Sequence, residues 1–273
     1  ATGHQHQFLI RRQIGCGASC LVYEACYADS PSHLVRIKEC YPVQNAPIRD
    51  GRQLKWLEES QREKAFERFE EGFNIQRFLQ GTEEMGNVAV HMPIEMCEGN
   101  NTRYIVMEVD YGETLDQYPI SSLEDALVIA KALAGILGGY HRRGYLHLDL
   151  KPENVLVLRE SPSVLKLFDM DSLICKQDIK NGFFSNLSYS PRWAAPELRE
   201  GLFSQIGERT DIYAVGAVLF WMVMGREAGC DDRSIFAEWE FDGPLFEGQN
   251  PQLQRVFQQI FRRTLCCRAE HRF

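Results

Sequence analysis

The segment His-Leu-Asp-Leu-Lys-Pro-Glu-Asn, residues 147–154, decides the fold of this chain. Within six positions it carries a carboxylate at Asp149, an ammonium at Lys151 and an amide at Asn154. Short apolar runs, Gly-Tyr-Leu and Val-Leu-Val, precede and follow it. The plainest interpretation is a charged turn between two short strands, but this order of residue types would then be an accident.

The three polar side chains match the needs of phosphoryl transfer. The reaction requires a residue that orients and deprotonates the attacking hydroxyl, cations that neutralise the phosphoryl oxygens, and a ligand for Mg²⁺. Asp149, Lys151 and Asn154 can meet these needs in that order. The segment therefore predicts a catalytic loop for phosphoryl transfer.

The segment resembles the catalytic loop of eukaryotic-type (Hanks-type) Ser/Thr protein kinases, H-R-D-L-x-x-x-N, with Leu148 in place of the Arg. A group of bacterial Ser/Thr kinases is also similar around residues 37–42. The resemblance implies ATP and Mg²⁺ as cofactors, Asp149 as the base, Lys151 at the γ-phosphate and Asn154 on the metal. Because Leu148 cannot bind a phosphate as Arg does, we predict a non-RD kinase whose activity does not depend on phosphorylation of its activation segment.

A glycine-containing loop at residues 14–22, Ile-Gly-Cys-Gly-Ala-Ser-Cys-Leu-Val, stands where kinases cover the nucleotide phosphates. Gly15 and Gly17 allow the backbone to approach phosphate oxygens and present amide groups to them. Cys20 replaces the third glycine of the family pattern. The resemblance implies that Val22 touches the adenine.

The sequence Val-Arg-Ile-Lys at residues 35–38 resembles the kinase strand whose lysine binds the α- and β-phosphates. Lys38 is therefore the expected phosphate ligand. Arg36 shares its strand face and replaces an Ala of the family. Its side chain either folds outward, stacks on the base or blocks the pocket. Glu71 is the expected partner of Lys38, because side chains at i+4 and i+7 on its helix are apolar. The resemblance also assigns nucleotide contacts to Met107, Glu108, Val109 and Leu156.

After the catalytic loop, an alternating strand leads into Asp169-Met-Asp171, where the family has D-F-G. Asp169 is the expected second Mg²⁺ ligand beside Asn154. Asp171 replaces a glycine and so removes backbone freedom at the start of the activation segment.

Three further positions resemble supporting parts of the kinase fold. Glu197, in Ala-Pro-Glu, is expected to pair with Arg272, and Asp211 is expected beneath the catalytic loop. Ser190, together with Lys151, indicates Ser/Thr rather than Tyr specificity.

The order of the motifs predicts an α+β, protein-kinase-like two-lobed fold. A small antiparallel-sheet N-lobe with one main helix is expected over residues 1–109, and a larger, mainly helical C-lobe over residues 110–273. The expected elements are three strands in 8–41, a helix over 58–79, two strands in 89–109 around a turn at 98–101, and a helix over 121–140.

Composition narrows the function classes. With 30 Lys and Arg against 38 Asp and Glu, the net charge is −8, which argues against nucleic acid as a partner. The longest apolar stretch, residues 212–225, is shorter than the ~20 residues of a membrane span, so it predicts a buried helix. Nine cysteines without paired C-x-x-C spacing indicate no zinc site and a reducing compartment, the cytoplasm.

The leading hypothesis is an active Ser/Thr kinase that phosphorylates protein hydroxyls. The alternative is a pseudokinase, a nucleotide-binding or empty module that acts on a regulatory protein partner, and it is motivated by Arg36, Cys20 and Asp171. A small-molecule phosphotransferase is disfavoured by the Ala-Pro-Glu segment and Ser190, which form a peptide-facing surface in the family.

Overall fold

The chain forms two compact units, one ending at Tyr111 and one beginning at Gly112, where the sequence predicted a boundary after Val109. The computed structural model describes residues 6–17, 19–43, 47–80, 93–159, 162–168, 172–183, 187–229, 239, 241, 244–247 and 249–273.

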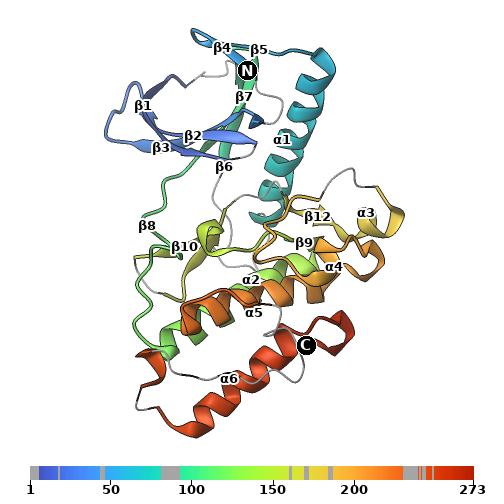
Figure 1. Cartoon of the computed structure of the whole chain (residues 1–273). Coiled ribbons are helices and arrows are strands. Elements are labelled where there is room, and N and C mark those ends of the chain that lie inside the picture. Colours follow the sequence, from blue (N-terminus) through green and yellow to red (C-terminus); the bar gives the residue numbers. More distant parts are fainter. Residues whose placement is uncertain are drawn as a thin grey trace. The chain divides into compact units, whose positions relative to one another are not determined.

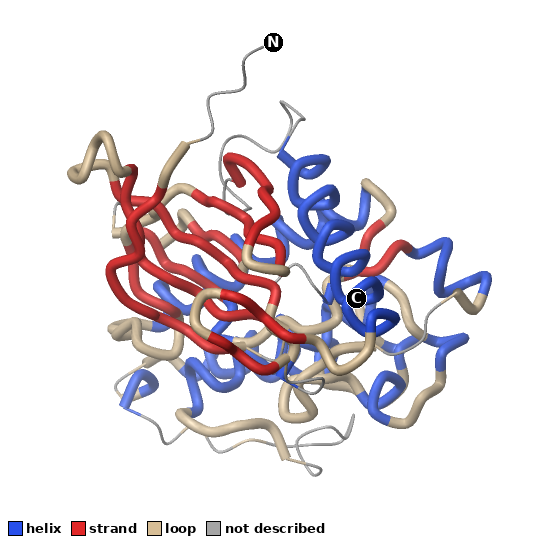
Figure 2. Tube along the Cα trace, turned by 90° about the horizontal axis from the view of Figure 1, so that it is seen from above, coloured by secondary structure: helices blue, strands red, loops and turns tan. Residues whose placement is uncertain are grey.

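The first unit is built on a five-stranded antiparallel sheet (Figures 1 and 2). Its order across the sheet is β1 (Phe8–Cys16), β2 (Cys20–Tyr27), β3 (Leu34–Cys40), β7 (Thr102–Met107) and β6 (Pro93–Gly99). Between β6 and β7, Asn100 and Asn101 have positive φ angles of 53° and 58°. Two-residue hairpin turns that match the strand twist require such angles, which Asn tolerates.

The two faces of strand β3 pack against different apolar clusters. Val35 and Ile37 pack with Ala25 and Val106 on one face. Cys40 lies on the opposite face, in a cluster with three phenylalanines of helix α1 (Glu59–Gln80), which are Phe66, Phe69 and Phe73. Alternation along the strand therefore places Lys38 on the α1 side of the sheet.

A short hairpin, β4 (Ile48–Asp50) and β5 (Gln53–Lys55), was not predicted. Its strands are too short to show alternation, although Asp-Gly at their junction is a turn signal. The hairpin is held by Glu39, which is 1% exposed and accepts hydrogen bonds from Arg49 (2.6 Å), Tyr23 (2.7 Å) and Tyr104 (3.2 Å). This buried carboxylate is satisfied by three donors.

Helices form the core of the second unit, in which α2 (Leu123–Arg142) and α6 (Pro251–Thr264) both pack on α5 (Glu208–Met224) (Figure 1). Helix α5 is buried nearly all round, which accounts for its apolar sequence. A Cβ atom at Gly216 would lie 2.2 Å from the Thr264 hydroxyl, so this glycine permits the close approach of α5 and α6. None of the helices in the described ranges is long and apolar enough to cross a membrane.

Short elements complete the second unit. A three-stranded sheet has the order β11 (Leu165–Leu167), β10 (Val155–Leu158), β8 (Gly112–Thr114), and β12 (Ile174–Cys175) pairs with β9 (Tyr145–Leu146). The short helices are α3 (Lys176–Asn181), α4 (Pro196–Arg199) and single 3-10 turns at Pro152–Asn154, Phe203–Gln205, Pro244–Phe246 and Ala269–His271. The loop that carries Asp149 runs from β9 to β10.

These elements confirm the α+β class, with one main helix beside the first unit's sheet and mainly helices in the second unit. Helix α2 was expected over 121–140 and begins two residues later, because the Ser122 hydroxyl accepts a hydrogen bond from the Asp125 amide at 3.0 Å and so caps the helix.

Candidate functional site

The loop at residues 147–154 is anchored by Asp211 in the first turn of α5, as predicted. The buried Asp211 carboxylate accepts hydrogen bonds from the backbone amides of His147 and Leu148, each at 2.9 Å. Its Oδ2 also lies 2.8 Å from Nε2 of the buried His141. Three contacts from one carboxylate therefore fix the backbone just before Asp149.

Four polar side chains that the sequence singled out meet at Asp149. The Lys151 ammonium donates to Asp149 Oδ2 at 3.1 Å and to the Ser190 hydroxyl at 2.8 Å. The Asn154 amide donates to the Asp149 carbonyl at 3.1 Å. Asp149 is 6% exposed, and within the described part of the chain its Oδ1 has no hydrogen-bond partner. One carboxylate oxygen beside a cation is therefore left to accept a hydrogen bond from a hydroxyl.

Asn154 ends the 3-10 turn Pro152–Asn154, and its carbonyl accepts a hydrogen bond from the Phe168 amide at 2.8 Å. The residue directly before Asp169 is therefore tied to Asn154. Asp169 and Asp171 themselves lie outside the described residues. This backbone pairing holds Asn154, an expected Mg²⁺ ligand, next to the residue that precedes the other expected ligand.

Leu148 occupies an apolar environment that the sequence did not reveal. Its side chain is 4% exposed and its φ angle is +62°, a left-handed conformation that side chains rarely adopt. It belongs to an apolar cluster with Leu146, Ala194, Leu198 and Ile206, and the partly buried Ile174, Ile179, Leu187 and Tyr189 pack against this cluster. The apolar cluster that contains Leu148 is thus packed against Ile179, Leu187 and Tyr189, which lie between β12 and α4 in the chain.

The predicted pair of Glu197 and Arg272 is present and fully buried. Arg272 donates from both Nη atoms to the two carboxylate oxygens, at 2.6 and 2.9 Å, and the Thr210 hydroxyl donates to the same carboxylate at 2.9 Å. The guanidinium also donates to the backbone carbonyls of Cys266, Cys267 and Arg209. This bidentate geometry, with two parallel hydrogen bonds, is typical of an Arg–carboxylate pair.

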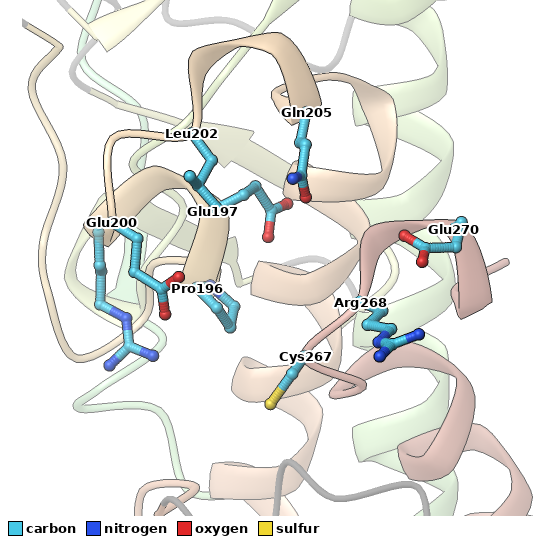
Figure 3. Close-up of a pocket in the computed structure, with 9 residues that line it drawn as sticks. Pro196, Glu197, Glu200, Leu202, Gln205, Cys267, Arg268 and Glu270 are labelled. Carbon is cyan, nitrogen blue, oxygen red and sulfur yellow. The ribbon is translucent and has the colours of Figure 1, made fainter.

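A cavity of about 480 Å³ lies beside this ion pair (Figure 3). Its lining combines the cations Arg199 and Arg268 with the anions Glu200 and Glu270. Glu197 also lines the cavity, so three carboxylates stand against two guanidinium groups, and its residues are distinct from the cluster around Asp149.

In the first unit, Lys38 stands opposite Val22 on β2 and Ile105 on β7, and its ammonium lies 5.9 Å from the centre of the Phe69 ring. Gly15 pairs with Val22, and the Gly17 amide donates to the Cys20 carbonyl at 2.8 Å, closing the loop. The sheet register therefore brings together three of the residues expected around a nucleotide.

The structure does not bring Glu71 to Lys38. Glu71 is exposed, and the ion pairs of the described residues do not include one between these two side chains. The neighbouring Glu70 instead pairs with Arg103 at 2.7 Å. The sequence argument placed Glu71 on a face that α1 buries only in part, because Ile75 is 7% exposed but Phe78 is 52% exposed.

Arg36 lies on the same strand face as Lys38, opposite Met107. One of its Nη atoms donates to the Asp110 carbonyl at 3.4 Å, and burial lowers the pKa of this guanidinium. Met107 is buried, Val109 is half-buried and Glu108 is exposed. Arg36 therefore reaches the backbone directly after the three residues to which the resemblance assigns contacts with the base.

Leu156, the remaining residue with an expected nucleotide contact in this group, lies on β10 of the second unit and is buried.

Comparison with known proteins agrees with the resemblance found in the sequence. A family model described as the protein kinase domain matches residues 8–241. Calcium-dependent protein kinase 2 of Arabidopsis thaliana is 32% identical over 141 residues, which are 50% of this chain and 19% of that protein. Maternal embryonic leucine zipper kinase of Danio rerio is 30% identical over 220 residues, which are 76% of this chain and 32% of that protein.

A bacterial relative and a solved structure are also similar. The probable serine/threonine-protein kinase PknB of Lactococcus lactis is 26% identical over 61% of this chain and 27% of its own length. The structure titled PpkA-294 apo form matches with a TM-score of 0.68 and 23% identity, over 97% of this chain and 92% of that one. The chain spans a third or less of the three curated relatives named above. The structural match confirms the predicted fold, and the relatives support the predicted enzyme class, Ser/Thr kinase.

Proposed function

The chain belongs to the protein kinase domain family, and we propose that it transfers the γ-phosphoryl group of ATP to Ser and Thr hydroxyls of proteins. The observation that carries this proposal is the cluster in which Lys151 joins Asp149 to Ser190 while Asp149 Oδ1 is buried without a partner in the described residues. Such a carboxylate oxygen is suited to accept the proton of an incoming hydroxyl.

Each residue of this cluster has a role in the proposal. Asp149 orients the hydroxyl through Oδ1 and takes its proton as the new ester bond forms. Lys151, already bound to Asp149 Oδ2, neutralises charge on the transferred group. Ser190 holds the Lys151 ammonium in place.

ATP with Mg²⁺ supplies the phosphoryl group when bound, and the donor set fits these ligands. Asn154 and Asp169 would hold the metal, and Lys38 the phosphates together with the backbone of Gly15 and Gly17. Glu71 remains the proposed partner of Lys38 in the nucleotide-bound state. The proposed base contacts are Val22, Met107, Glu108, Val109 and Leu156.

We further propose that activity is independent of activation-segment phosphorylation. A phosphate bound by Arg orders this segment in many kinases, whereas here the apolar cluster around Leu148 packs against Leu187 and Tyr189. The segment is therefore held without added charge. Phosphatase treatment is expected to leave the rate of phosphate transfer unchanged, and a large loss of rate would contradict this proposal.

A pseudokinase is the second candidate, favoured by Arg36, whose guanidinium extends to the Asp110 carbonyl. Such a module would act through a regulatory protein partner. For the compartment we propose the cytoplasm, supported by the absence of disulfides among the cysteines of the described ranges.

The test is incubation of the chain with γ-labelled ATP, Mg²⁺ and generic protein substrates, followed by identification of the labelled residues. Label on Ser and Thr is expected. A parallel thermal-shift titration with Mg-ATP distinguishes the alternatives, because a ligand at 100 times its Kd stabilises a protein by about 2.7 kcal/mol. No label together with no shift would favour the empty pseudokinase. Label on small alcohols in place of proteins would favour a small-molecule phosphotransferase.

A further inference from the structure

Two cysteines face each other directly across strands β2 and β3. The register pairs Cys20, the first residue of β2, with Cys40, the last residue of β3. The other cysteines of the described strands each stand opposite a different residue type: Cys16 faces Leu21, Cys26 faces Leu34, Cys97 faces Tyr104 and Cys175 faces Tyr145.

The backbone hydrogen bonds show which kind of cross-strand pair this is. The Tyr41 amide donates to the Ser19 carbonyl at 3.0 Å, so the bond lies between the residues that directly flank Cys20 and Cys40. Since hydrogen-bonded and non-hydrogen-bonded pairs alternate along an antiparallel ladder, Cys20 and Cys40 form a non-hydrogen-bonded pair. In such pairs the Cα atoms are about 4.5 Å apart, which lies within the range of about 4.4–6.8 Å found for disulfides.

Both side chains also point to the same side and share one environment. They belong to the apolar cluster beneath α1, at 6% exposure for Cys20 and 2% for Cys40. The cover over Cys20 is thin, because a Cβ atom placed on Gly17 would lie 3.8 Å from Cys20 Sγ. Gly17 is exposed, so the Cys20 sulfur lies directly beneath an exposed part of the loop.

We propose that Cys20 and Cys40 are a redox modification site, a dithiol pair that a hydroperoxide oxidises reversibly to a disulfide. The Cys20 thiolate attacks the peroxide oxygen, breaking the O–O bond and giving a sulfenic acid and one molecule of water or alcohol. The Cys40 thiol then attacks the Cys20 sulfur, the S–S bond forms and water leaves. Two electrons pass from the two sulfurs to the peroxide, and a dithiol reductant returns them by thiol–disulfide exchange.

The bond would alter the contact between the sheet and α1. In the reduced structure, the Cys40 thiol donates to the Ala65 carbonyl of α1 at 3.7 Å. Disulfide formation removes this donor at a position two residues from Lys38 on the same strand face. The oxidation state of the pair is therefore coupled to the packing of α1 beside Lys38.

The test is disulfide mapping of the full chain, and it does not depend on kinase activity because its readout is a covalent bond. The reduced chain is titrated with hydrogen peroxide, quenched with an alkylating agent and digested with trypsin. Cleavage after Arg36 and Lys38 places Cys20 and Cys40 in separate peptides. A linked peptide pair whose fragmentation joins Cys20 to Cys40, and which disappears on treatment with dithiothreitol, is expected.

Two variants sharpen the result. Cys16→Ser removes the exposed thiol of the same loop and is expected to leave the linked pair intact, whereas Cys40→Ser is expected to abolish it. The proposal is overturned if the wild-type Cys20 and Cys40 are both alkylated at peroxide doses that oxidise Cys16. A link from Cys40 to Cys16 or Cys26 in place of Cys20 would also overturn it.

Discussion

Replacing Arg272 with Ala is expected to destabilise the second unit severely. The change removes both Arg272 donors to Glu197, a carboxylate that is 1% exposed; among the described residues its other side-chain donor is the Thr210 hydroxyl. It also removes donors from three backbone carbonyls. Removing one member of a buried ion pair leaves the other charge without a partner and lowers the free energy of unfolding by about 3–5 kcal/mol. At roughly 2–4 °C per kcal/mol, the midpoint of thermal unfolding should fall by roughly 6–20 °C.

Urea denaturation and thermal melting of Arg272→Ala measure this cost, with Arg268→Ala as the matched control. Arg268 is exposed, so its replacement should change stability by no more than about 0.5 kcal/mol. The loss of stability in Arg272→Lys should lie between those of the two Ala variants. An ammonium keeps the positive charge but cannot form the bidentate hydrogen bonds of a guanidinium. If Arg272→Ala lost less than about 1 kcal/mol, the reasoning from the buried pair would be refuted.

Two further predictions concern the second unit. Leu148→Ala should lower the free energy of unfolding by about 2–5 kcal/mol. It should also speed amide hydrogen exchange at Leu187 and Tyr189, which pack on the cluster that contains Leu148. Unchanged exchange at both residues would contradict a role of Leu148 in holding them in place. A hydrogen bond that the Ser121 hydroxyl donates to the Asp125 carboxylate lowers the pKa of Asp125. The stabilisation by this carboxylate is therefore complete above its ordinary pKa and is lost as pH falls through the lowered pKa. The difference in free energy of unfolding between wild type and Asp125→Asn should therefore be constant from neutral pH to about pH 5 and should disappear below about pH 4. Urea titrations that find the same difference at every pH would contradict this prediction.

The sequence predicted the parts of this molecule that follow from local pattern or from ordered motifs. The turn at Asn100 and Asn101 and the buried helix α5 follow from local residue chemistry. The contacts of Lys151 with Asp149 and Ser190 follow from motifs whose order along the chain matches a known family.

Other features depend on contacts that no single segment encodes. The burial of Leu148 arises from residues up to 58 positions later, at Ile206. Whether Glu71 faces Lys38 depends on how three phenylalanines of α1 dock on the sheet. Helical periodicity, from which Glu71 was expected, does not determine this docking. The pairing of Cys20 with Cys40 depends on strand register, which is set by the turn between β2 and β3.

The central claim is that Asp149 accepts the proton of a protein hydroxyl, and the rate of phosphate transfer by Asp149→Asn tests it most directly. Asn is nearly the same size but cannot take the proton, so kcat should fall by about 10²–10⁴-fold. The thermal shift with Mg-ATP should persist, which shows that the variant is folded and binds nucleotide. Equal transfer of labelled phosphate by the variant and the wild type would contradict the account.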